Sequence, residues 1–200
     1  MMTNGRNEVL LEGTAQGEPS LSHEARDVPF YRLMLEVPRL SGQSDLLPLL
    51  LRGDMLAQVS DGARVRVSGQ FRSYNNRSGE GRRLVLSVYA LALLPPQDEA
   101  CNRITLVGAL CKPPVFRRTP LGRSICDLML AVPRRCGRAD YLPLIAWGQL
   151  AARTAALCVG DPLALSGRIQ SRLYRKVTEQ GEEVRTAYEV SVMELSEEEQ

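Results

Sequence analysis

Residues 140–174 read DYLPLIAWGQLAARTAALCVGDPLALSGRIQSRLY, and this stretch predicts a strand, a short helix and a second strand. The apolar residues at 142, 144 and 146 alternate with the positions between them, so they should share the buried face of a strand. Tyr141 and Trp147 should then project together from the opposite face. Beyond Gly148, apolar residues at 150, 151, 157 and 158 recur at roughly helical spacing, which predicts the helix.

A second alternating strand begins after Gly160 and Asp161. Its buried face is predicted to hold Leu163, Leu165, Ile169 and Leu173, and its exposed face Arg168, Gln170, Arg172 and Tyr174. Exposed rings can stack on unpaired bases and guanidinium groups can pair with phosphates, so this pattern suits a sequence-tolerant binder of single strands. It also suits aromatic side chains that only cover a small barrel, and the stretch alone leaves both interpretations open.

The chain contains an internal repeat. A shift of 95 residues aligns LMLEVPR (33–39) with LMLAVPR (128–134), and LPL (47–49) with LPL (142–144). After a three-residue insertion, Ser68-Gly69 aligns with Ser166-Gly167. We therefore expect two homologous domains, residues 1–96 and 97–200, joined near PPQDEA (95–100), whose prolines and acidic residues are typical of a linker.

Each unit is predicted to contain five strands and one short helix. The strands are expected at 8–15, 29–38, 46–51, 63–74 and 82–94 in the first unit, with a helix at 53–59, and near 102–110, 123–133, 139–147, 161–174 and 183–195 in the second. This order predicts an all-β chain of two tandem Greek-key barrels of the oligonucleotide/oligosaccharide-binding (OB) type. Pro48 and Pro143 each remove a ladder donor, which predicts an edge or a bulge in the third strand.

The composition argues against a membrane protein. The chain is 44% hydrophobic, contains no apolar run of about 18 residues, and begins with MMTNGRNEVLLEG, which lacks a basic segment followed by an apolar one. We expect neither a transmembrane helix nor a signal peptide, and a cytoplasmic location.

The sequence offers no candidate for catalysis or metal binding. Its five cysteines form no CxxC pair, and His23 is the only histidine. We expect reduced thiols, no metal site and no cofactor. An enzyme such as a barrel-based nuclease would need a nucleophile–base pair or a metal cluster, so we predict that the protein is not an enzyme.

The net charge of +2 hides an uneven distribution. Residues 101–193 contain 14 Lys+Arg against seven Asp+Glu, giving 14 − 7 = +7, whereas residues 1–96 contain 11 arginines against 10 acids. The acidic residues after 193 mask the basic second half in the total. Basic surface attracts phosphates without regard to sequence.

Five segments of the second unit form a series: NRITLVGALCKPP (102–114), RTPLGRSICDLMLAVPRR (118–135), YLPLIAWGQLA (141–151), GDPLALSGRIQSRLY (160–174) and AYEVSV (187–192). In order and spacing they resemble the bacterial single-stranded DNA-binding protein family along nearly the whole unit. The first unit resembles that family more loosely, mainly through the repeat. The resemblance implies non-sequence-specific binding of single-stranded DNA, which protects the strand in replication, repair or recombination.

The resemblance also implies site residues. In that family DNA bases stack at the start and end of the third strand and at the end of the fourth, positions that fall here on Tyr141, Trp147 and Tyr174. The full set of candidate DNA-binding residues is Tyr141, Trp147, Tyr174, Arg168, Arg172, Arg134 and Tyr74. In the first unit, Leu46 and Arg52 replace Tyr141 and Trp147, so we expect binding mainly in residues 101–195.

Partners are predicted from the same resemblance. The family commonly presents four barrels, so we expect a homodimer in which Leu46 and Leu50 are covered; a monomer with its barrels packed face to face is the alternative. ELSEEEQ (194–200) is acidic but lacks the Pro-Phe tip with which the family recruits replication and repair proteins. The alternative function is an accessory module of the primosome type, which assembles with proteins and has little DNA affinity; RNA as the ligand is also left open.

Overall fold

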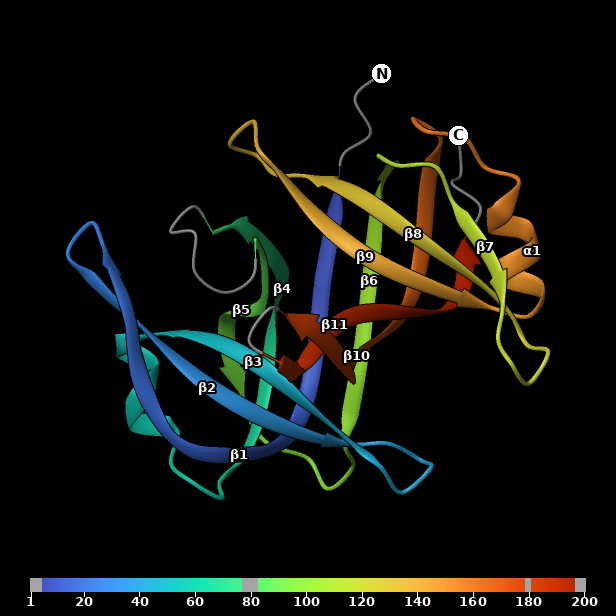
Figure 1. Ribbon diagram of the computed structural model, residues 1–200. Coiled ribbons are helices and arrows are strands. Elements are labelled where there is room, and N and C mark those ends of the chain that lie inside the picture. The colour runs from blue at the N-terminus through green and yellow to red at the C-terminus, as the bar shows by residue number, and fades with distance from the viewer. Residues whose placement is uncertain (1–4, 77–82, 179–180, 197–200) are drawn as a thin grey trace.

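The computed structural model describes residues 5–76, 83–178 and 181–196 (Figure 1). The first unit contains β1 (Arg6–Ala25), β2 (Val28–Pro38), β3 (Ser44–Arg52), the 3-10 helix η1 (Gly53–Gln58), β4 (Arg64–Asn75) and β5 (Leu84–Leu94). The second contains β6 (Cys101–Leu110), β7 (Val115–Arg118), β8 (Ser124–Pro133), β9 (Ala139–Trp147), α1 (Gln149–Ala155), β10 (Pro162–Thr178) and β11 (Gly181–Ser196).

Strand pairing closes each unit into a barrel. In the first unit β1 pairs with β2, β2 with β3, β3 with β5, β5 with β4, and β4 with β1 again. In the second unit the same circuit runs through β6, β8, β9, β11 and β10 and returns to β6. Five strands with a helical segment between the third and fourth form an OB fold, so the predicted tandem OB barrels are confirmed.

The two barrels share one continuous sheet. Residues 6–12 of β1 pair antiparallel with residues 101–107 of β6, and the two strands lie side by side between the barrels in Figure 1. Together the barrels form an 11-stranded sheet. One cluster of buried apolar side chains runs through both units, with Leu11 and Ile104 among its members. The units are therefore packed together, not merely tethered.

The segment between β5 and β6 is held by Glu12, whose side chain is fully buried. Its carboxylate accepts a hydrogen bond from the backbone N–H of Gln97 and pairs with Arg64, which donates in turn to the Asp98 carbonyl oxygen over 3.0 Å. The predicted boundary between residues 96 and 97 lies in this segment and stays a prediction about how the chain divides into domains.

Two buried aspartates join the units across a pseudo-twofold axis. Asp140 of β9 pairs with Arg134 of its own unit, with Arg72 of the first unit at 3.4 Å, and with the backbone N–H of Ser73 at 2.7 Å. The Ser73 Oγ accepts from the Tyr141 N–H at 2.7 Å. The aspartate thus receives donors from both barrels.

The repeat reproduces this arrangement in reverse. Asp45 of β3 pairs with Arg39 of its own unit, with Arg168 of the second unit at 3.6 Å, and with the backbone N–H of Ser171 at 2.7 Å. The Ser171 Oγ accepts from the Leu46 N–H at 3.2 Å. Each third strand is therefore fixed to the fourth strand of the other barrel. The hydrogen bond and ion pair to Asp45 raise the pKa of Arg39.

The strand faces follow the predicted alternation except at two residues of β10. Leu163, Leu165 and Ile169 are buried as expected, but Leu173 is 71% exposed and Gln170 only 8% exposed. Beyond residue 170 the paired strands β10 and β11 extend out of the barrel as a hairpin, where no core covers Leu173. Gln170 is buried together with Glu189, and its Nε2 is satisfied by donating to Glu189 at 2.8 Å.

Helix and strand boundaries show smaller differences. The helix predicted after Gly148 ends at Ala155, so Leu157 and Cys158 lie beyond it. The short strand β7 and the extension of β1 to Ala25 were not predicted. The predicted start of the first unit's fifth strand, residue 82, falls outside the described residues.

The prolines lie where one strand edge is open, as predicted. β3 pairs with β2 along its whole length but with β5 only at the two residues after Pro48. β9 likewise pairs with β8 along its whole length and with β11 only at the two residues after Pro143. Within residues 5–76, 83–178 and 181–196, neither helical segment is long and apolar enough to span a membrane.

Replacing either aspartate should destabilise the whole chain. Asp45→Ala and Asp140→Ala each leave buried donors and an arginine without their partner, and the expected loss is about 3–5 kcal/mol of unfolding free energy. Urea denaturation measures it. Asp54→Ala is the matched control, because its ion pair with Arg52 is exposed and should contribute about 0–1 kcal/mol. Equal urea midpoints for all three variants would contradict the role of the two aspartates in joining the barrels.

Candidate nucleic-acid interface

The outer face of β9 presents two aromatic side chains at its ends. Tyr141 is 44% and Trp147 39% exposed, while the intervening Leu142, Leu144 and Ala146 point into the core. Six residues of strand separate the two rings by about 20 Å along β9. This spacing leaves room for several bases of an extended single strand between them.

Tyr174 lies on β10 where that strand leaves the barrel. The Arg172 guanidinium lies over the Tyr174 ring, 6.0 Å from its centroid. Both side chains belong to the same face of the hairpin, since they are two residues apart on one strand. Arg172 is also paired with Glu189, its Nε 3.6 Å from the Glu189 Oε1.

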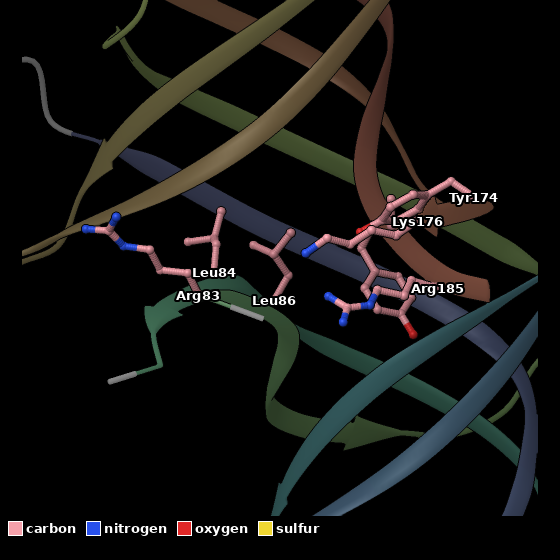
Figure 2. A pocket seen from close by; sticks show the side chains of 8 residues that line it. Arg83, Leu84, Leu86, Tyr174, Lys176 and Arg185 are labelled. Atoms are coloured by element: carbon pink, nitrogen blue, oxygen red, sulfur yellow. The ribbon is translucent and has the colours of Figure 1, made fainter. Parts of the chain in front are cut away.

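A groove of about 460 Å³ lies between this hairpin and the first unit. Tyr174, Lys176 and Arg185 line it from the hairpin, and Arg83, Leu84 and Leu86 line it from the other barrel. In Figure 2 the Lys176 ammonium reaches toward Leu86. The groove therefore places an aromatic ring and cations of one unit opposite two leucines and an arginine of the other.

Arg134 and Arg168 lie in the contact between the units. Arg134 is paired with Asp140 and donates to the Ser73 carbonyl oxygen at 2.9 Å. Arg168 is paired with Asp45 at 3.6 Å and donates to Gln170 at 3.4 Å. Both arginines are thus already paired with buried carboxylates, and they are not free cations beside Tyr141 and Trp147. Their contact with phosphates stays a prediction.

Tyr74 is exposed on the first unit but does not correspond to Tyr174. The backbone N–H of Ser73 donates to Asp140 as that of Ser171 donates to Asp45, so the two serines are equivalent in the repeat. Tyr74, the residue after Ser73, therefore occupies the place of Arg172. Arg32 donates to the Tyr74 hydroxyl over 3.4 Å. Leu46 remains 43% exposed, so the packing of the two barrels does not hide it.

Arg117 is a candidate that the sequence analysis missed. It lies on β7 in register with Ile125 of β8, which is itself in register with Trp147, so Arg117 and Trp147 share a face. Its Nε donates to Asp127 at 2.6 Å, and this hydrogen bond, with a smaller contribution from the charge of Glu189, raises the pKa of Arg117. Little in the sequence indicated this strand, because the alternation of side chains in β7 extends over only four residues.

Acidic side chains neutralise much of the basic second unit. Glu189 is buried beside Arg172, and Asp127 is paired with Arg117. On the hairpin, Arg175 is paired with Glu182 at 3.6 Å and Arg185 with Glu183 at 2.7 Å. The charge of +7 therefore overstates the free positive charge available to a polyanion.

The described residues contain no group of three or more His, Cys, Asp or Glu side chains that could hold a metal ion. All five cysteines are free thiols. Burial raises the pKa of Cys111 and of Cys126, which favours the unreactive protonated form of both. The described part of the chain thus presents neither a cluster of metal ligands nor a thiol activated by a lowered pKa.

The fold and this surface define a tandem OB-fold protein with an aromatic and basic outer face. Residues 101–196 match the Single-strand binding protein family. Single-stranded DNA-binding protein B of Bacillus subtilis is 38% identical over 36% of this chain and 71% of its own length. The chain therefore belongs to the single-strand binding protein family.

Two further relatives show how far the similarity extends. A single-stranded DNA-binding protein of Clostridium tetani is 39% identical over 36% of this chain, and the chain spans 55% of that relative's length. The single-stranded DNA-binding protein of Thermus aquaticus is 28% identical over 84% of this chain and 76% of that protein. Its wild-type crystal structure has a TM-score of 0.77 at 24% identity, covering 97% of this chain and 93% of that chain, which shows the shared fold of both units.

Proposed function

We propose that this protein binds single-stranded DNA without sequence specificity and protects it in replication, repair or recombination. The observation that carries the proposal is the pair of exposed rings, Tyr141 and Trp147, on one face of an OB barrel. Membership of the single-strand binding protein family supports it. We propose no catalytic role; the three relatives are all called DNA-binding proteins.

Binding follows from stacking and charge. Bases stack on Tyr141, Trp147 and Tyr174, because every base has a π face and the contact tolerates any sequence. Arg172 and Lys176 lie beside Tyr174 and suit the phosphates, as Arg117 does beside Trp147. Arg134 and Arg168 would reach phosphates only by sharing donors that already bind Asp140 and Asp45.

The alternative function is a protein-binding accessory module, and one observation favours it. Leu173, Val177 and Val184 are all exposed on one face of the β10–β11 hairpin. An exposed apolar stripe of this kind suits a protein partner. A chain that binds proteins through this stripe but fails to bind oligo(dT) would support the alternative over DNA binding.

We further propose a homodimer presenting four barrels, located in the cytoplasm, where the free thiols would stay reduced. Leu91 and Met193 support the dimer. They occupy equivalent β-bulges, opposite Ser68/Gly69 and Ser166/Gly167, and both are exposed. Two equivalent apolar side chains on one sheet suit a contact with a second copy.

Alanine substitutions should locate the main binding face. Trp147→Ala and Tyr141→Ala should each weaken binding of oligo(dT) about tenfold or more, since stacking contributes roughly 1–3 kcal/mol per base. Fluorescence anisotropy of a labelled oligonucleotide measures the affinity. Leu46→Ala is the control, because Leu46 occupies the place of Tyr141 in the first unit. Equal losses in all three variants would refute the predominance of the second unit.

Removing the negative charge of the buried Glu189 beside Arg172 should strengthen binding of single-stranded DNA. Glu189→Gln keeps a hydrogen-bonding partner for Gln170 but releases Arg172 from its ion pair. We expect tighter binding and a steeper dependence of log K on log salt, by about 0.7, the value for one phosphate contact on a single strand. Glu182→Gln is the control, because Glu182 lies on the other face of the hairpin. An unchanged slope in Glu189→Gln would show that Arg172 does not gain a phosphate.

Sedimentation equilibrium tests the dimer. The expected mass is about 44 kDa, twice the 22.1 kDa of one chain. Leu91→Glu with Met193→Glu should lower it toward one chain, because burying two carboxylates in an apolar contact is unfavourable. Leu46→Glu, tested alongside, shows whether the third strand is also covered. A concentration-independent mass of one chain for the unaltered protein would rule the dimer out.

A further inference from the structure

The first unit carries aromatic side chains on its outer face at positions that the second unit does not use. Phe30 of β2 lies in register with Arg52 of β3, the residue that replaces Trp147. Tyr89 of β5 lies in register with Leu50 of β3, two residues before Arg52, so it is diagonal to Phe30 with β3 between them. The Phe30 and Tyr89 ring centroids are 6.1 Å apart. The face that lacks the usual aromatic residues has therefore gained others.

These rings belong to a longer array. His23 of β1 stacks on Phe30, with centroids 5.1 Å apart and planes 12° from parallel. On the other side, the Arg72 guanidinium lies over the Tyr89 ring, 5.9 Å from its centroid. The array thus combines residues of four strands, from the exposed His23 on β1 to the guanidinium of Arg72 on β4, and spans β3 between β2 and β5. Rings and guanidinium groups are the two kinds of partner that unpaired bases use.

The charge around this array favours a polyanion. Arg32 lies on the same face as Phe30, two residues further along β2, and forms no ion pair with any described residue. Arg52 has an exposed ion pair with Asp54, of the same kind as that of Arg117 with Asp127 on the second unit. Arg172 of the second unit is paired instead with the buried Glu189. Arg32 therefore offers this face a cation that no described carboxylate neutralises.

We propose that Phe30 and Tyr89, with Arg32 and Arg52, form a second binding platform for single-stranded nucleic acid, so that both barrels bind one strand through different residues. The inference rests on the proposed function of the second unit. A base extends the array at its His23 end, by stacking on the exposed ring of that histidine. The first unit then contributes when the strand is long enough to reach it.

The repeat supplies variants that should fold normally. Ile125 occupies the place of Phe30, because it pairs with Trp147 as Phe30 pairs with Arg52. Ser191 occupies the place of Tyr89, because each pairs with the third strand at the same step. Phe30→Ile with Tyr89→Ser therefore installs residues that the other barrel already accepts. Phe116→Ile is the matched control, since Phe116 is exposed on β7 but faces away from Trp147.

Two oligonucleotide lengths separate the platforms. With oligo(dT) of about 8 nucleotides, within the roughly 4–16 that one OB fold covers, the double variant should bind like the unaltered protein, as followed by Trp147 fluorescence. With about 30 nucleotides, affinity should fall about tenfold or more, since stacked bases are lost. Phe116→Ile should change neither affinity. Unchanged affinity of the double variant for the long oligonucleotide would overturn the inference.

A direct reporter completes the test. In a Trp147→Phe, Tyr89→Trp variant, the one tryptophan lies on the first unit, and the long oligonucleotide should quench its emission. No quenching there at saturation, while Trp147 of the unaltered protein is quenched, overturns the second platform and leaves the proposed function intact. If neither oligonucleotide binds the unaltered protein, the proposed function itself fails.

Discussion

Two carboxylates that accept donors from both barrels hold this molecule in one arrangement. A buried Asp45 or Asp140 without partners would cost several kcal/mol, so each requires its own arginine and the backbone N–H of a serine on the other unit. That requirement fixes the third strand of each barrel against the fourth strand of its neighbour. Since Tyr141 follows Asp140 directly, the same contact sets where the second unit's aromatic face begins. Fold and candidate interface therefore depend on one set of hydrogen bonds.

Local periodicity predicted the barrels well. Alternation identified the strands of both units, and it placed Tyr141 and Trp147 on a common face, because both ends of β9 are exposed on that face although Ile145 between them is buried. It failed at Gln170 and Leu173, where β10 passes from the barrel to a free hairpin and the burial of a face no longer depends on strand parity. Periodicity could not show that Arg168 pairs with Asp45, because the two residues belong to different barrels. It could not show that Arg134 pairs with Asp140 either, because that contact depends on how the β8–β9 hairpin folds. Phe30 could be assigned to an outer face from β2 alone, but its neighbour Tyr89 follows only from the parallel pairing of β3 with β5.

The basic residues of the second unit illustrate why charge counts mislead. Arginine can bind phosphate only where it is not already bound to a carboxylate. Arg117 and Arg172 each have an acidic neighbour on the proposed binding face, so a phosphate bound there would compete with Asp127 or Glu189. For the proposed binding of a single strand, such competition would weaken the complex and ease release of the strand.

The direct pairing of β1 with β6 has a consequence for how the two barrels can change. In an assembly of identical subunits, every substitution appears in all copies at once, so a residue needed by one barrel is imposed on the others. Here the neighbouring barrels are encoded separately within one chain. Leu46 and Arg52 can therefore replace an aromatic pair on one side while Tyr141 and Trp147 persist on the other. A single strand that binds both barrels as proposed therefore meets two different surfaces.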